Sequence, residues 1–120
     1  MTKQSNTEYE AMNDDILASA TIPIRVGILQ EAIGLTAGDR NRTYGEPVQN
    51  MQHIADIFNA ITGRDLTAWE AATFHRATKL ARSAGNKTHR DSTVDETAYA
   101  GIAYECALAA ELAKQSNNGA

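Results

Sequence analysis

Apolar residues recur at helical spacing in four stretches of this chain, and each stretch is bounded by residues that start or end helices. Pro23 and Pro47 suit the first turn of a helix, where the missing N–H of proline costs nothing, and Gly38, Gly63 and Gly85 suit helix ends. The chain has only 2 prolines, many alanines and few β-branched runs, so no strand pattern competes with helix. We therefore predict an all-α fold, a small bundle of four to five helices.

The third and fourth helices carry start signals of their own. Thr67-Ala-Trp-Glu70 and Ser92-Thr-Val-Asp95 both match the capping box, in which an acid three positions on bonds back to the residue that precedes the helix. The apolar side of the third helix is then predicted to carry Trp69, Ala72, Ala77, Leu80 and Ala81. That of the second helix is predicted to carry Met51, Ile54, Ile57, Phe58 and Ile61.

One domain accounts for most of the 120 residues. We predict that residues 1–21 form a flexible or weakly helical arm, residues 22–113 the helical bundle and residues 114–120 a disordered tail. The core of the bundle is thin and rich in alanine, and small domains bury proportionally less surface. Partner subunits would add to that core, so we expect a homo-oligomer.

Bulk composition excludes several classes of function. The net charge of -4 argues against a general nucleic-acid binder, which needs a basic surface. No apolar run approaches membrane-spanning length and the first residues lack a signal-peptide core, so we expect a cytoplasmic protein with no membrane partner. Cys106 is the single cysteine, in an apolar helical stretch where an inert core thiol is expected. His53, His75 and His89 show no zinc-site spacing.

Three acids are candidate metal ligands. Glu31 falls inside the apolar stripe of the first helix, so it is paired, protonated or bound to a metal, unless it lies at the solvated edge of the stripe. Asp91 and Asp95, four residues apart at the start of the fourth helix, are suited to hold Mg²⁺ with waters. Their alternative role is to stabilise that helix start locally.

Cations approach these acids from the third helix and the loop after it. His75, Lys79 and Arg82 share one helix face, and His89 and Arg90 flank the acidic helix start. Arginine and lysine beside carboxylates that hold a divalent ion are typical of a phosphate site, although a solvated basic face gives the same pattern.

The stretch GDRNRTYGEP, residues 38–47, adds further candidates for a ligand site. Its Asp39, Arg40 and Tyr44, with Asn50 one turn into the next helix, are suited to contact phosphate or base. Read in isolation, the same residues are equally explained as a loop whose glycines and proline make the turn.

Two segments carry a resemblance to a known family. DRNRTYGEPVQNMQHIADIF and KLARSAGNKTHRDSTVDETAYAG resemble a small helical domain of bacteriophages and prophages, over about residues 27–105. That domain is similar in turn to the MazG-like all-α nucleoside-triphosphate pyrophosphohydrolases, which are oligomers that use Mg²⁺ held by two pairs of acids. The resemblance implies Glu31 as one acid of the first pair and Asp95 as the final acid of the second. Gly34 and Ser92 stand where the other two acids belong.

The resemblance leaves three hypotheses. The first is a Mg²⁺-dependent nucleotide pyrophosphohydrolase in the bacterial host, with Glu31 and Asp95 as catalytic acids. The second is a non-catalytic protein that sequesters a nucleotide or a cyclic-nucleotide defence signal, and therefore does not need the missing acids. The third is a helical protein-interaction module.

Overall fold

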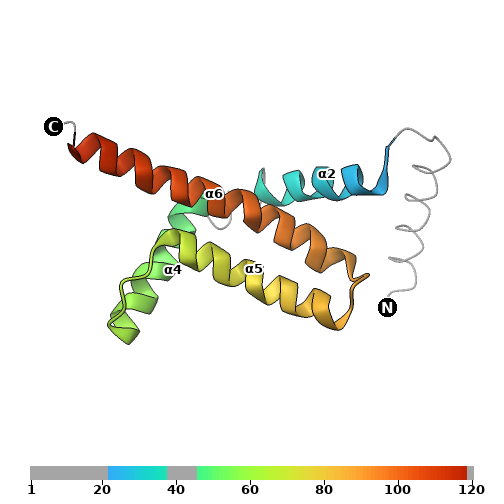
Figure 1. The fold of residues 1–120 in the computed structure, drawn as a ribbon, viewed down its shortest axis with the longest axis horizontal. Helices are drawn as coiled ribbons and strands as arrows, with labels where there is room; N and C mark the ends of the chain where they lie inside the picture. Colours follow the sequence, from blue (N-terminus) through green and yellow to red (C-terminus); the bar gives the residue numbers. More distant parts are fainter. Residues whose placement is uncertain (1–21, 38–45, 119–120) are drawn as a thin grey trace.

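The computed structural model describes residues 22–37 and 46–118, and within them the chain is all-helical, with four helices and no strand (Figure 1). These are α2 (Ile24–Thr36), α4 (Pro47–Thr62), α5 (Ala68–Gly85) and α6 (Arg90–Asn118). The predicted fold class is confirmed for these residues. The predicted arm, residues 1–21, lies outside them.

Helix α6 is the element that joins the others. It forms an antiparallel pair with α5, α2 packs along its first half, and α4 crosses near the start of α5 (Figure 1). In the described part of the chain no helix is both long and apolar enough to cross a membrane.

The sequence signals predicted correctly where α4 begins and ends and where α5 begins. Pro47 is the first residue of α4, and Gly63 ends it with a left-handed φ of 72°. Before α5, Thr67 and Glu70 form the predicted capping box, in which the Glu70 carboxylate accepts the Thr67 N–H at 3.0 Å. The same carboxylate also accepts the Thr67 hydroxyl at 2.7 Å.

The predicted start of α6 is wrong. The helix begins at Arg90, so Ser92 lies in its first turn instead of capping it. His89 takes the capping role, because its Nδ1 accepts the Ser92 N–H at 3.3 Å and lies 2.7 Å from the Ser92 hydroxyl oxygen. At the other end the helix continues past Lys114 to Asn118, through residues predicted to form a disordered tail.

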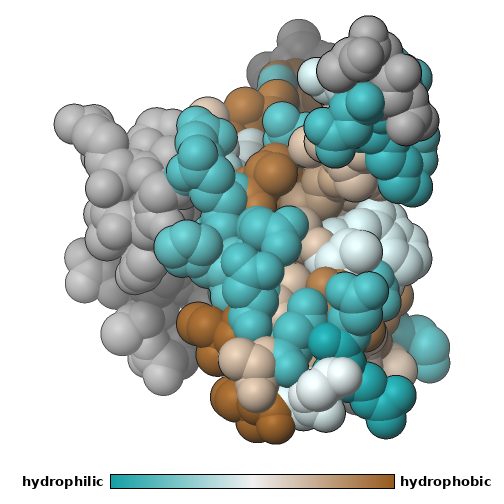
Figure 2. Space-filling model, turned by 90° about the vertical axis from the view of Figure 1, so that its left-hand side faces the viewer, coloured by the Kyte–Doolittle hydropathy of each residue, from teal (hydrophilic) through white to brown (hydrophobic). Residues whose placement is uncertain are grey.

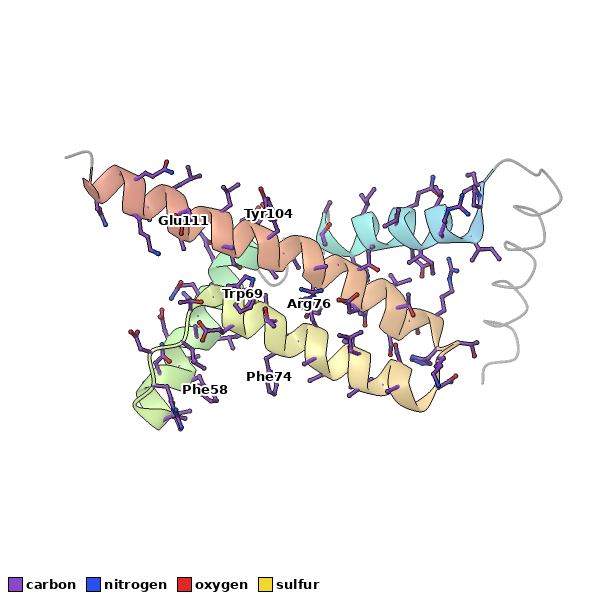
Figure 3. The ribbon with its side chains drawn as sticks, in the orientation of Figure 1. Phe58, Trp69, Phe74, Arg76, Tyr104 and Glu111 are labelled. Carbon is purple, nitrogen blue, oxygen red and sulfur yellow. The ribbon has the colours of Figure 1, made fainter. Side chains whose placement is uncertain are left out.

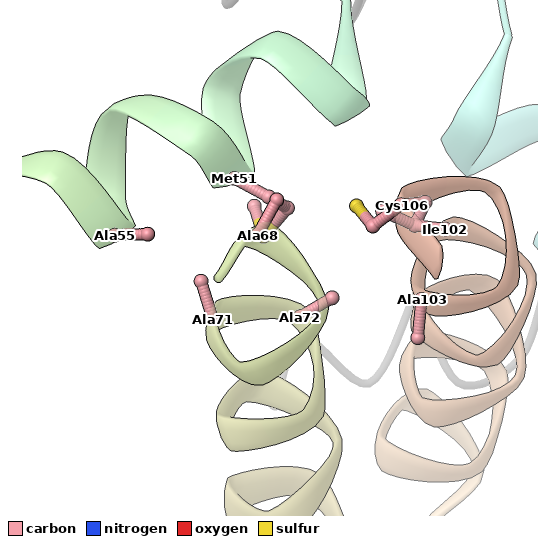
Figure 4. Close-up of a cluster of buried hydrophobic side chains, with 8 residues drawn as sticks. All are labelled: Met51, Ala55, Ala68, Ala71, Ala72, Ile102, Ala103 and Cys106. Atoms are coloured by element: carbon pink, nitrogen blue, oxygen red, sulfur yellow. The ribbon is translucent and has the colours of Figure 1, made fainter. Parts of the chain in front are cut away.

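Two small apolar clusters lie on different sides of α6. Between α2 and α6 the buried residues are Ala32, Val94 and Ala98, with Ile28 and Leu35 packed against them. Between α4, α5 and α6 the buried residues are Met51, Ala55, Ala68, Ala71, Ala72, Ile102, Ala103 and Cys106 (Figure 4). Burial of Cys106 confirms the predicted core thiol, and it raises the pKa of that thiol.

Several large side chains that were predicted to lie on the buried faces of α4 and α5 are not part of the second cluster. Ile57 and Ile61 of α4, and Trp69 and Leu80 of α5, are exposed. Alanines occupy the buried face of α5, because they let α5 approach α4 and α6 closely. Hydrophobic size therefore did not predict the buried face of α5.

Replacing two glycines by alanine should change the stability of the fold in opposite directions. Gly34 lies inside α2, and an added Cβ there would meet nothing within 4 Å, so Gly34→Ala should raise the free energy of unfolding by about 0.5–1 kcal/mol. Gly63 has a left-handed backbone, so Gly63→Ala should lower it by about 1–2 kcal/mol. Urea unfolding followed by far-UV circular dichroism measures both. A change of the same sign in the two variants would contradict this explanation.

Candidate functional site

Two ion pairs bring α2, α5 and α6 together at the start of α6. Both Nη2 and Nε of Arg90 donate to the Glu31 Oε2, at 2.9 and 3.2 Å. Lys79 Nζ of α5 lies 3.0 Å from the Asp95 Oδ2 of α6. With Asp91, which raises the pKa of Glu31 by its charge, these residues form what we call the charged cluster: Glu31, Lys79, Arg90, Asp91 and Asp95.

The sequence left open how the Glu31 carboxylate is accommodated in the apolar stripe of α2. It is only partly buried and it is paired with Arg90. Burial nevertheless raises its pKa above the ordinary value, and the charges of Asp91 and Asp95 raise it further. The charges of Asp91 and Asp95 therefore repel that of Glu31, and a cation beside Glu31 lowers that repulsion.

A second layer of contacts joins α5 to α6 beside the charged cluster. Arg76 Nε donates to the Glu96 Oε1 at 2.8 Å, and the Arg76 side chain lies between the two helices (Figure 3). The rings of His75 and Tyr99 stack with centroids 4.8 Å apart and planes 7° from parallel. The antiparallel pairing of α5 and α6 therefore places an aromatic pair one turn from Lys79.

The other predicted ligand-binding residues lie in different places. Asp39, Arg40 and Tyr44 fall outside the described residues. Asn50 is exposed on α4, a helix that contributes no residue to the charged cluster. Arg82 is exposed on α5, one turn beyond Lys79 toward the start of α6, and His89 is held in its capping contact with Ser92.

The predicted metal ligands do not form a ready metal site in the described ranges. Within residues 22–37 and 46–118 no group of three or more His, Cys, Asp and Glu side chains is arranged to hold a metal ion. Glu31 and Asp95 face the cations Arg90 and Lys79. At the two positions where the MazG-like pattern has acids, Gly34 borders open space and Ser92 is buried against His89. Oxygen donors suit Mg²⁺, but among the described residues Glu31 and Asp95 are paired with cations.

Sequence reasoning missed how the cluster is paired. The sequence places Arg90 beside the acidic start of α6, but its partner Glu31 is 59 residues away, and no local spacing predicts such a contact. Arg76 and Glu96, 20 residues apart, were missed as a pair for the same reason. For Arg76 and Glu96 the available signal is that two helices joined by a short turn run antiparallel and bring such positions face to face.

His75 makes the stability of the protein depend on pH. Burial lowers its pKa below the ordinary 6.5, and the Lys79 charge lowers it further, so the unfolded chain binds this proton more tightly than the folded chain. Its contribution to stability is therefore present above pH 6.5 and is lost as the pH falls below 6.5 toward the lowered value. We expect His75→Phe, which keeps a ring against Tyr99, to lose less stability than the wild type between pH 7.5 and 5.5.

Urea unfolding at the two pH values tests this expectation. His53→Phe is the matched control, because His53 is exposed on α4 and does not belong to the stacked ring pair of α5 and α6. It should keep the wild-type difference between pH 7.5 and 5.5. Equal pH dependence in wild type and His75→Phe would show that another group is responsible.

Comparison with known proteins places these features in a family. A family model described as a domain of unknown function (DUF6378) matches residues 27–107. This chain belongs to the DUF6378 family. The matched range contains every member of the charged cluster and both apolar clusters, so the DUF6378 domain is the part of the chain that carries the candidate site.

Two phage proteins are similar to this DUF6378 chain. The "Gene 55 protein" of Mycobacterium phage D29 is 38% identical over 74 residues, which is 62% of this chain and 49% of that protein. The "Gene 55 protein" of Mycobacterium phage L5 is 32% identical over 78 residues, 64% of this chain and 50% of that protein. The chain thus spans about half the length of these relatives. The resemblance to a bacteriophage domain is confirmed, and no solved structure matches the chain.

Proposed function

We propose that this phage-type helical domain binds a nucleotide through its phosphates at the charged cluster, without a resident metal ion. The observation that supports this most is the set of cations that α5 and α6 gather there. Lys79 and Arg90 lie within the cluster, and Arg82 is exposed one turn along α5. Arginine and lysine are the side chains that bind phosphate oxygens in proteins.

The ion pairs with Glu31 and Asp95 do not prevent this binding. Both pairs are partly exposed, and such pairs contribute only about 0–1 kcal/mol each. A phosphate group carries more charge than one carboxylate, so it can replace a carboxylate oxygen beside Lys79 or Arg90 at small cost. The remaining contacts to the nucleotide stay predictions. They are Asp39, Arg40, Tyr44, Asn50 and the exposed His89. In this proposal Mg²⁺ enters only as the counter-ion of the bound phosphates.

A second candidate function is the Mg²⁺-dependent pyrophosphohydrolase of the MazG-like type, with Glu31 and Asp95 as its catalytic acids. The observation in its favour is that the charges of Asp91 and Asp95 act on Glu31 and raise its pKa, since a cation near Glu31 would lower that repulsion. The ion pairs argue against it, because Glu31 is paired with Arg90 and Asp95 with Lys79. We therefore place binding ahead of hydrolysis, with sequestration of a nucleotide or cyclic-nucleotide defence signal as the form that binding alone would take.

One experiment separates these functions. The full chain is incubated with Mg²⁺ and a panel of nucleoside triphosphates and cyclic dinucleotides, and both product release and retained ligand are measured. The binding proposal expects a ligand that is released unchanged on denaturation. Pyrophosphate release that disappears in Glu31→Gln and Asp95→Asn would support the hydrolase instead. If the chain neither retains nor converts any of these compounds, both proposals fail and a protein-interaction module becomes the better hypothesis.

A further inference from the structure

The second half of α6 presents an apolar stripe that no described residue covers. Tyr104, Leu108 and Leu112 are spaced by four residues, so they share one helix face, and they are 68%, 44% and 55% exposed. Every residue from Leu108 to Asn117 is exposed. This segment continues a helix that is already formed, and covering its apolar stripe would remove that surface from water, which is favourable.

This stripe continues the face of α6 on which α2 packs. Val94 and Ala98 lie under Ala32 of α2, and alternating steps of three and four residues lead from Ala98 through Gly101, the exposed Glu105 and Leu108 to Leu112. α2 ends at Thr36, so it covers only the first part of the face. Open space surrounds the Cβ position of Gly101, which leaves room for a second helix to approach closely.

Helix α2 also carries exposed apolar side chains, next to the part of α6 that it covers. Its residues are apolar around most of the helix, and Leu29 and Ile33 stay exposed while Ala32 packs on α6. Tyr104 projects from α6 on the side where α2 lies, away from α5 (Figure 3). In Figure 2, brown apolar surface is open to solvent among teal polar groups at the end of the molecule where both α4 and α6 finish.

The size of this surface fits an interface between proteins. We call Leu29, Ile33, Tyr104, Leu108 and Leu112 the α2–α6 face. At roughly half exposure, five large side chains offer on the order of 500 Å² of apolar surface, whereas a specific interface buries about 800 Å² per partner, somewhat over half of it apolar.

Within this sequence, the residues outside the described ranges hold fewer large apolar side chains than the described helices expose. Large exposed hydrophobic side chains in the described ranges number twelve. The remaining residues, 1–21, 38–45 and 119–120, contain only six large apolar or aromatic ones: Met1, Tyr9, Met12, Ile16, Leu17 and Tyr44. A second copy presents the same stripe, and a self-complementary face is what a two-fold dimer uses.

We propose that two copies of this chain form a symmetric dimer through the α2–α6 face, with Leu108 at its centre. The charged cluster lies at the start of α6 and is not part of this interface, so the dimer does not depend on nucleotide binding.

Sedimentation equilibrium of the full chain tests the dimer, and charge substitutions test the face. Leu108→Asp places a carboxylate in the interface and should raise the dimer dissociation constant on the order of 100-fold. Ala110→Asp is the matched control, because Ala110 is exposed two residues away on the opposite side of α6 and receives the same charge. It should stay dimeric. Far-UV circular dichroism checks that both variants keep the helical content of the parent.

A cross-link gives an independent readout of the same contact. Leu108→Cys should form a disulfide-linked dimer under mild oxidation, whereas Ala110→Cys and the parent chain should not, since Cys106 is buried. A parent chain that is monomeric at all concentrations would overturn the proposal and leave the face to other residues or another protein. Equal dimerisation of Leu108→Asp and Ala110→Asp would overturn it too, because the interface would then lie elsewhere.

Discussion

Met51→Ala should lower the free energy of unfolding by about 2–4 kcal/mol, the largest stability change that we expect from a single truncation in this chain. Met51 is 3% exposed and lies between α4, α5 and α6 in a cluster otherwise built mainly of alanines (Figure 4). Small neighbouring side chains cannot move into the space that it leaves, so the cavity persists. Because small domains are only marginally stable, thermal denaturation should show a fall in Tm of roughly 10 °C.

Ile61→Ala is the matched control for this substitution. Ile61 lies on the same helix, has a side chain of similar size and is 78% exposed, so its truncation should change the free energy of unfolding by less than about 0.5 kcal/mol. Urea unfolding measures both variants. If the two lose similar stability, the cluster around Met51 is not the core of the fold and the packing of α4 on α5 and α6 is wrong.

Lys79→Met and Asp95→Asn should change nucleotide affinity in opposite directions, although they break the same ion pair. The methionine keeps the length of the side chain but removes a charge-assisted contact to phosphate, so we expect affinity to fall by about 10- to 100-fold. The asparagine removes a negative charge that competes with phosphate for Lys79. Affinity should then stay the same or rise by up to about 10-fold.

Isothermal titration with a retained nucleotide measures this pair of variants, with and without Mg²⁺. Loss of the ion pair alone should reduce stability by no more than about 1 kcal/mol, so both variants should remain folded. Weaker binding in both variants, and only when Mg²⁺ is present, would mean that Asp95 holds a metal ion. That result would contradict simple phosphate binding and favour the hydrolase.

Local signals in the sequence predicted helix ends better than helix faces. The Pro47 start, the Gly63 end and the Thr67–Glu70 capping box act within one turn, so a short stretch of sequence contains them completely. The start of α6 was missed because the pattern at Ser92 resembled a cap, while His89 makes the actual capping contact with an imidazole nitrogen. The buried faces depend on how closely helices approach, so alanines take the place of the larger residues that spacing alone suggested.

At the candidate site too, the sequence predicted which residues near one another in the chain lie together, but not the contact between distant residues. Sequence spacing predicted that Asp91, Asp95 and Lys79 would be near one another, because α5 and α6 are joined by a short turn. For Glu31 the sequence left several alternatives open, and one of them was an ion pair. It did not identify Arg90 as that partner, since a contact over 59 residues depends on where α2 crosses α6.

The most direct test of a phosphate site at the charged cluster is a nuclear magnetic resonance titration of the ¹⁵N-labelled full chain with ATP, and with tripolyphosphate as a probe of the phosphates alone. We predict saturable shifts of the backbone amides in three segments, around Glu31 of α2, Lys79 of α5 and Arg90 of α6. Tripolyphosphate should affect the same segments. Amides that do not respond to either probe, or that respond only along α4, would contradict binding at the charged cluster.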